Sequence, residues 1–363
     1  MVVKALGLRS SKKIMMKSSL SKKRVLVFGA AGFMGTYLID ALLNSNYHVV
    51  AADIDASNED YFLERNISFI NIDITKSDDF LKLEGEFFDV VVHLAAHQPA
   101  NVSDKNDDPE SYMQVNVIGT LNILKYCKNS HVGKVIYGSS HRNTQGLWPA
   151  KKPLSESDGR AIKFDTEYTL FSISETAAQD LVEYYNTQHD LQCITFRLPP
   201  VYGYGPHTEI FKDGKPIKTG FQIFIDKAIT GEPIEVWGDT NVGRDIIYIK
   251  DVINAFVLAI EHPDASGIFN ITSGKKLTLM EEVETIIDVF SEQNNKPELI
   301  KRPDISNNID SFYYDISKAK EVLGWSPSFS FKDMLVDFIK ESSAKKFSHL
   351  VDKRQVNINE YNQ

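Results

Sequence analysis

A short apolar run followed by a glycine-rich turn limits what this chain can fold into more than any other feature. Residues 24–28 read RVLVF, the β-branched pattern of a buried parallel strand. Gly29, Gly32 and Gly35 follow in the spacing G-x-x-G-x-x-G, and the next residues have helical periodicity. Such glycines let the chain turn tightly and let backbone N–H groups approach a pyrophosphate at the helix N-terminus. The pattern therefore predicts a strand–turn–helix unit that binds a dinucleotide.

The second strand of this unit ends on an acidic residue. HVVAAD ends at Asp53, and a carboxylate at this place accepts hydrogen bonds from an adenosine ribose. No Arg or Lys follows in IDASNED, and the negative charge would repel a 2′-phosphate. NAD is therefore favoured over NADP as the cofactor. Phe33 and Met34, which lie between the last two glycines, are expected to line the same site.

The following residues continue to alternate between apolar runs and helical stretches. Parallel neighbours need crossover connections, so this alternation predicts βαβ units in a parallel sheet. We expect an α/β fold, namely a Rossmann-type doubly wound parallel sheet with a smaller mixed α/β substrate-binding lobe. The predicted strands are 67–73, 88–96, 134–140 and 191–198, and the longest predicted helices are 109–129 and about 166–189.

Changes in composition divide the chain into parts. Residues 1–24 hold eight basic and no acidic side chains, which fits either a flexible tail or an organelle transit segment. After Pro199-Pro200, glycine and proline become denser and the elements become short. The predicted parts are a basic flexible tail (1–23), an NAD-binding Rossmann domain (24–199, to which 244–262 is expected to return), a substrate lobe (200–243 and 263–344) and a second tail (345–363).

Composition argues against several classes of protein. The 363 residues carry a net charge of −9, which argues against nucleic acid as a partner. No apolar run is long enough for a membrane span, so no membrane partner is expected. Cys127 and Cys193 have no C-x-x-C spacing and no metal-ligand cluster occurs, so no metal is expected. Two isolated cysteines fit a reducing compartment, and a cytoplasmic location is expected.

Further motifs follow the glycine turn in a fixed order. With the G-x-x-G-x-x-G spacing, they resemble the extended short-chain dehydrogenases/reductases. Within that group they resemble the NAD-dependent epimerase/dehydratase family, which acts on nucleotide-diphosphate sugars. The resemblance covers residues 24–340. The motifs are Asp73-Ile74, HLAA (93–96), NVIGT (116–120), RLPPVYG (197–203), RDIIYIKDV (244–252), FNITSG (269–274) and DISKAKEVLGW (315–325).

The resemblance implies roles for residues in these motifs. NAD would lie in the first lobe and a nucleotide-diphosphate sugar between the lobes, with guanidinium groups anchoring the diphosphate. The implied cofactor contacts are Asp73, Ile74, Leu94, Ala95, Ala96 and Asn116. The implied substrate contacts are His97, Ser140, Phe171, Arg244 and Arg302.

The resemblance also implies a homodimer, in which the helices 109–129 and 166–189 pair with their copies in a four-helix bundle. Both helices carry apolar positions beyond the needs of one face, which supports this pairing. These positions include Ile123, Leu124, Leu181 and Tyr185.

The chain departs from the family at its proton relay. The family uses a Ser or Thr together with Tyr-x-x-x-Lys, in which the lysine lowers the pKa of the tyrosine. Ser140 fills the serine position, but Phe171 stands where the tyrosine is expected and Glu175 where the lysine is expected. Phe171 has no proton to exchange, and a carboxylate would raise rather than lower the pKa of a neighbouring acid. Glu175 could still hold the ribose of NAD.

Three residues are candidates for a relocated proton relay. They are His141, which follows Ser140, Tyr168, one helical turn before Phe171, and Glu175 itself. Ordinary 4,6-dehydration is disfavoured, because His141-Arg142 replace the Asp-Glu pair of those dehydratases. Two functions remain open. One is a nucleotide-sugar enzyme with a noncanonical relay, and the other is a catalytically silent NAD- and nucleotide-sugar-binding protein or partner subunit.

Overall fold

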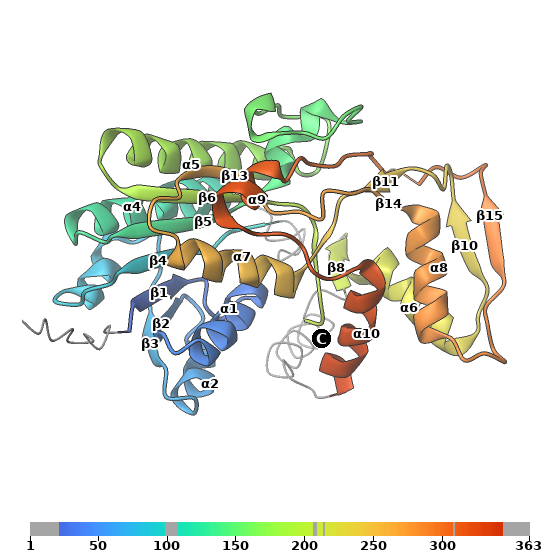
Figure 1. Cartoon of the computed structure of the whole chain (residues 1–363), viewed down its shortest axis with the longest axis horizontal. Coiled ribbons are helices and arrows are strands. Elements are labelled where there is room, and N and C mark those ends of the chain that lie inside the picture. Colours follow the sequence, from blue (N-terminus) through green and yellow to red (C-terminus); the bar gives the residue numbers. More distant parts are fainter. Residues whose placement is uncertain (1–21, 99–107, 206–208, 213–214, 308, 344–363) are drawn as a thin grey trace, which may run out of the picture.

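The computed structural model describes residues 22–98, 108–205, 209–212, 215–307 and 309–343. Its main feature is a seven-stranded parallel sheet in the order β13-β6-β5-β4-β1-β2-β3 (Figure 1). This sheet confirms the predicted α/β fold of the Rossmann type. The strands are β1 (Arg24–Phe28), β2 (His48–Asp53), β3 (Ser68–Asn71), β4 (Val90–His93), β5 (Lys134–Ser140), β6 (Gln192–Leu198) and β13 (Gly267–Asn270).

Six of these strands fall where the sequence predicts them, but β13 does not. It lies in residues 263–344, which the sequence analysis assigns to the substrate lobe, yet it pairs in parallel with β6 at the edge of the main sheet. The predicted return to the substrate lobe at residue 263 therefore lies too early in the chain, because β13 still belongs to the main sheet. The sequence of such a short strand does not indicate which strand it pairs with. The pairing of Gly267 with Ile194 is set by the tertiary structure.

Two helical layers cover the faces of the sheet. Side chains alternate along β1, so Val25 and Val27 join the hydrophobic cluster that includes α1 and α7, while Leu26 and Phe28 join the cluster that includes α4 and α5. Both faces are thus buried, as a parallel sheet requires. The helices are α1 (Phe33–Asn44), α7 (Ile249–Glu261), α4 (Thr120–Asn129) and α5 (Thr169–Gln188).

The predicted helix 109–129 forms, but its middle is wound more widely than an α-helix. A short α3 (Pro109–Tyr112) leads into a π-helical segment (Met113–Gly119) and then into α4. π-Helical turns often occur at functional sites, because they redirect side chains. Here the segment contains Asn116, which reaches towards the end of β4.

Smaller elements build a second lobe beside the carboxyl ends of the strands (Figure 1). Its hydrophobic side chains continue the cluster of α1 and α7, so both lobes share one core. The remaining strands are β7 (Val201–Tyr202), β8 (Glu209–Lys212), β9 (Lys215–Lys218), β10 (Ile234–Trp237), β11 (Gly243–Arg244), β12 (Ile247–Tyr248), β14 (Leu277–Thr278) and β15 (Leu299–Arg302). The remaining helices are α2 (Glu59–Leu63), α6 (Gly220–Thr230), α8 (Leu279–Phe290), α9 (Ser317–Leu323) and α10 (Phe331–Ser343).

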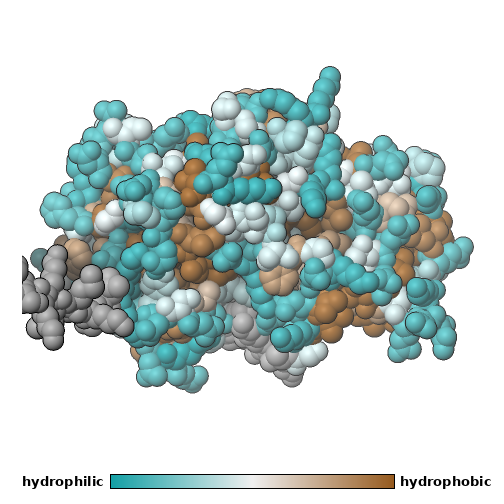
Figure 2. Space-filling view, in the orientation of Figure 1, coloured by the Kyte–Doolittle hydropathy of each residue, from teal (hydrophilic) through white to brown (hydrophobic). Residues whose placement is uncertain are grey.

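The surface does not single out a pair of helices for self-association. Ile123, Leu124 and Tyr185, which support the predicted homodimer in the sequence, are buried within this chain, so they no longer count as evidence for it. Hydrophobic side chains form separate patches over both lobes (Figure 2). The homodimer thus stays a prediction. Within the described residues, no helix combines the length and apolar character needed to cross a bilayer.

The start of α1 depends on glycine at position 35. A Cβ on Gly35 would overlap the carbonyl oxygen of Gly29 and lie 2.7 Å from that of Ala30. Gly35→Ala is therefore expected to lower the free energy of unfolding by about 1–3 kcal/mol, although alanine is otherwise the better helix residue. The matched control is Gly220→Ala, in the first turn of α6, where a Cβ meets nothing within 4 Å. Urea unfolding compares the two variants, and equal stability of both would contradict the prediction.

Candidate active site

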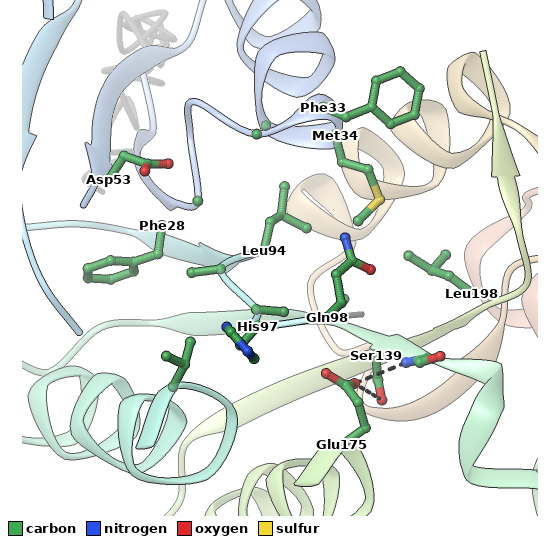
Figure 3. A pocket seen from close by; sticks show the side chains of 18 of the residues that line it. Phe28, Phe33, Met34, Asp53, Leu94, His97, Gln98, Ser139, Glu175 and Leu198 are labelled. Atoms are coloured by element: carbon green, nitrogen blue, oxygen red, sulfur yellow. Dashed lines mark hydrogen bonds between the residues drawn. The ribbon is translucent and has the colours of Figure 1, made fainter. Parts of the chain in front are cut away.

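A cleft of about 880 Å³ opens at the carboxyl ends of the parallel strands. This is the edge at which open α/β sheets bind their ligands, and the volume suits a cofactor site. Figure 3 shows Asp53 and Phe28 towards one end and Ser139 and Glu175 towards the other. Most of the predicted site residues line the cleft, namely Gly29, Gly32, Phe33, Met34, Gly35, Asp53, Asp73, Ile74, Leu94, Ala95, Ala96, His97, Ser140, His141, Tyr168, Phe171 and Glu175.

The glycine turn brings three backbone segments into close contact at the middle of the cleft. Gly29 has a φ of +76°, and a Cβ there would lie 2.5 Å from the backbone N of Ala95. Gly32 caps α1 without any side-chain hydrogen bond, and the first turn of α1 contains no acidic residue. A Cβ on Gly32 would meet only the carbonyl oxygen of Gly29, at 3.3 Å. The turn thus leaves helix N–H groups open to an anion, which fits the pyrophosphate of a dinucleotide.

Acidic residues lie at the end of the cleft where the adenosine is expected. One carboxylate oxygen of Asp53 accepts a hydrogen bond from the N–H of Ala31 at 2.9 Å, and the other accepts from Asp55 at 3.1 Å. Burial raises the pKa of Asp53 above its ordinary value. Asp73 accepts from the backbone and hydroxyl of Thr75. Lys76, which does not line the cleft, pairs with Asp73 at 3.2 Å, but Asp53 forms no ion pair among the described residues, so the site favours NAD over a 2′-phosphorylated cofactor.

Asn116 does not line the cleft, so its predicted direct contact with the cofactor is not supported. It is buried, and its amide oxygen accepts from the N–H of His97 at 2.7 Å while its NH₂ donates to the carbonyl of His97 at 2.9 Å. The same NH₂ lies 2.9 Å from the hydroxyl of Ser174. Asn116 therefore ties the loop after β4 to α5, and it positions the cleft wall that carries His97.

Glu175 is anchored to β5 by one of its two carboxylate oxygens. Oε2 accepts hydrogen bonds from the hydroxyl of Tyr137 at 3.0 Å and the backbone N–H of Ser140 at 3.1 Å. It also accepts from the hydroxyl of Ser139 at 3.2 Å (Figure 3). Burial raises the pKa of Glu175 to about 7, although these donors oppose the shift. The sequence analysis missed Tyr137 and Ser139 as partners. Their spacing of two along a strand, which places both on the face towards α5, is the signal that could have found them.

His141 lies in the cleft wall as a neutral imidazole. Its Nδ1 is 3.0 Å from the carbonyl oxygen of Leu198, so Nδ1 carries the proton and Nε2 is the acceptor. The ring packs against Trp148 and Phe312, with centroids 5.3 and 5.1 Å away. Burial, followed by the charge of Arg142, lowers the pKa of His141 well below its ordinary value. Within the described part of the chain, Nε2 is buried and has no hydrogen-bond partner.

Tyr168 and Phe171 lie at the start of α5 and line the same end of the cleft. Phe171 thus occupies the predicted place of the relay tyrosine with a ring that cannot exchange a proton. The guanidinium of Arg142 stacks on the ring of Tyr168, 3.7 Å from its centroid. Burial raises the pKa of Tyr168, and this outweighs the lowering by Arg142. Tyr168 therefore keeps its proton near neutral pH.

The two arginines implied as substrate contacts lie outside the cleft lining. Arg244 donates to the hydroxyl of Tyr202 at 2.7 Å and lies 3.8 Å from a carboxylate oxygen of Glu282. Arg302, on β15, forms ion pairs with Glu235 and Asp304 at 3.3 and 3.0 Å. The structure does not bring Arg302 to the cleft, because its strand pairs with β10 in the second lobe. No group of three or more potential metal ligands occurs in the residues that the structure describes.

Comparison with known protein families identifies the family of this chain. The model of the NAD dependent epimerase/dehydratase family matches residues 25–272, more than half of the chain. The chain belongs to this family, and NAD is its cofactor. The cleft fits that cofactor, because the open start of α1 and the acids beside it suit a pyrophosphate and an adenosine ribose.

Several of the relatives and solved structures carry nucleotide-sugar names. A putative UDP-glucose 4-epimerase of Methanocaldococcus jannaschii is 27% identical and covers 85% of this chain and 95% of its own. A UDP-glucuronate 4-epimerase of Thermodesulfobacterium geofontis is 27% identical, with 87% and 96% covered. The structure of a Thermotoga maritima UDP-glucose 4-epimerase with UDP-glucose has a TM-score of 0.73, 25% identity, and coverage of 89% and 99%.

The carboxylate of Asp53 is expected to set the preference for NAD. Asp53→Asn keeps an oxygen that can accept from Ala31 but removes the charge, so NAD binding should weaken about tenfold, as expected when a charged hydrogen bond becomes neutral. The ratio of NAD to NADP affinity should fall as well. Isothermal titration calorimetry measures both, with Asp60→Asn, an exposed acid on α2, as the control. Unchanged NAD affinity in Asp53→Asn would show that the ribose is held elsewhere.

Glu175 is expected to make the stability of the fold depend on pH. Its pKa rises from 4.5 in the unfolded chain to about 7 in the folded one, so the folded state holds the proton more tightly. The resulting stabilisation is complete below pH 4.5 and is lost as the pH rises through 7. Relative to Glu175→Gln, the wild type should lose roughly 3 kcal/mol between pH 4.5 and 8. Denaturant unfolding of both proteins across this range gives the difference, and a constant difference would refute the shift.

Proposed function

We propose that the protein is an NAD-dependent enzyme that modifies a nucleotide-diphosphate sugar and that Glu175 carries the proton transfer. The observation behind this proposal is the carboxyl group of Glu175, which lines the cleft at the end away from Asp53 and is held against β5 through one of its two oxygens. Burial raises its pKa to about 7. A general base works best when its pKa lies near the working pH. The names of the relatives support a nucleotide-sugar substrate.

Bound NAD supplies a hydride acceptor for the oxidation of a sugar hydroxyl, and the protein has to take up the proton of that hydroxyl. In this proposal Glu175 accepts it on Oε1. The hydrogen bonds of Tyr137, Ser139 and the backbone of Ser140 all go to Oε2, which leaves Oε1 without a bond among the described residues. These three donors fix the carboxylate against β5, so it needs no reorganisation when it accepts the proton.

The other two candidates fit the role of a base less well. His141 has a strongly lowered pKa, so it does not hold a proton for a return step. Tyr168 has a raised pKa and keeps its own proton. Both line the cleft, and Tyr168 remains suited to hydrogen bonding with the substrate through its hydroxyl, whereas Nε2 of His141 is buried.

The activity test uses NAD with UDP-, dTDP-, GDP- and CDP-sugars, and products are followed by mass spectrometry and NMR. The wild type should convert at least one sugar, and Glu175→Gln should lower the rate about 10²–10⁴-fold, because that is the usual worth of a general base. NAD affinity should change little. Glu183→Gln, an exposed acid on the same helix, is the control and should keep full activity. His141→Ala and Tyr168→Phe should fall less than Glu175→Gln.

Two results would overturn the proposal. If Glu175→Gln keeps the wild-type rate while His141→Ala or Tyr168→Phe loses it, the base lies elsewhere. If no sugar is converted and the double variant Phe171→Tyr with Glu175→Lys gains activity, the chain is a silent binding protein of the same family.

A further inference from the structure

The guanidinium of Arg142 is a cation without a partner in the cleft wall. Arg142 is the only Lys or Arg among the described residues that line the cleft. Its backbone N–H donates to the hydroxyl of Ser140 at 3.2 Å, which places the side chain directly after β5. Across the described residues, its guanidinium forms neither an ion pair nor a hydrogen bond. Its contacts are the faces of Tyr168 and Trp148, with centroids 3.7 and 5.7 Å away.

The charges around Arg142 leave this cation uncompensated. Burial lowers the pKa of Arg142, Tyr168 opposes this shift, and the charge of Arg244 adds to it. Glu167 is the carboxylate with a noticeable opposing effect, but it is exposed and forms no ion pair with Arg142. The acids Asp53, Asp55 and Asp73 belong to the adenosine end. Burying a guanidinium without an acceptor is costly, so an anion at this place would be bound favourably.

The position of Arg142 indicates which anion it meets. It shares the end of the cleft with Glu175, the proposed base, and with Phe171, where the reacting sugar would lie. The glycine turn offers helix N–H groups to the pyrophosphate of the cofactor, and Arg244 lies towards the second lobe, beside Tyr202 and Glu282. The planar fork of a guanidinium matches a carboxylate through two parallel hydrogen bonds. Stacking on Tyr168 holds the fork in one orientation.

We propose that Arg142 binds a carboxylate on the reacting sugar and thereby selects a nucleotide-linked uronic acid over its neutral counterpart. This inference rests on the proposed function. Tyr168 serves as the platform that orients the guanidinium, and Arg142 is a specificity-determining residue rather than the base.

Calorimetry on the full chain with NAD compares three probes, namely UDP-glucuronate, UDP-glucose and UDP. The first two differ by one carboxylate. Wild-type protein should bind UDP-glucuronate about ten- to a hundredfold more tightly than UDP-glucose, in line with a charged hydrogen-bonded pair. Arg142→Gln should lose this preference and keep its affinity for UDP-glucose and UDP. Arg142→Lys should retain part of the preference, because it keeps the charge without the fork.

Arg160→Gln is the matched control. Arg160 also carries a positive charge, but Asp180 and Glu183 pair with it at the surface, so the preference should be unchanged. If wild type shows no preference, or if Arg142→Gln weakens UDP as much as UDP-glucuronate, the inference is wrong and Arg142 serves no sugar carboxylate. If UDP, UDP-glucose and UDP-glucuronate all fail to bind folded wild-type protein that still binds NAD, the proposed function on UDP-sugars is contradicted. The inference about Arg142, which rests on it, is then contradicted as well.

Discussion

Parallel pairing of the strands is the constraint on which the rest of the structure depends. Because β1 to β6 run in one direction, all of their carboxyl ends meet at one edge. The glycine turn, Asp53, the segment after β4 and Ser140 come from distant parts of the sequence, and this edge brings them into one cleft. The close approach of Gly29 to Ala95 shows how tightly the loops are packed there. A side chain at position 29 would separate the loops on which the cofactor site rests.

In the proposed function, an acid at position 175 changes the electrostatics of the end of the cleft where the sugar would react. A lysine at position 175 would place a positive charge against β5, whereas Glu175 places an acid whose pKa of about 7 leaves it divided between two protonation states at neutral pH. The serine and tyrosine hydroxyls of β5, which donate to Oε2, suit a carboxylate. The neighbouring strand therefore provides donors that match a carboxylate at position 175, which supports the proposed role of Glu175.

The positive charge at the end of the cleft near Glu175 comes from Arg142, directly after β5. Arg142 follows β5 and stacks on Tyr168 at the start of α5, whereas Glu175 lies on α5 and accepts hydrogen bonds from β5. Their neighbour His141 stays neutral, because burial and the surrounding guanidinium groups disfavour its charged form. The cleft thus separates an acidic adenosine end from an end that contains a cation and a titrating carboxyl.

The sequence by itself determined six strands of the main sheet, the glycine turn and the position of Asp53 at the end of a strand, because short periodic patterns and local spacing encode strands and turns. Only the tertiary structure decided that β13 belongs to the main sheet, that Asn116 holds the loop of His97 and that Arg302 pairs away from the cleft. The partners of Glu175 and the unpaired state of Arg142 among the described residues were decided there as well. These features depend on which side chains meet across elements that are far apart in the chain, and on how far burial removes those side chains from water. A local sequence pattern encodes neither.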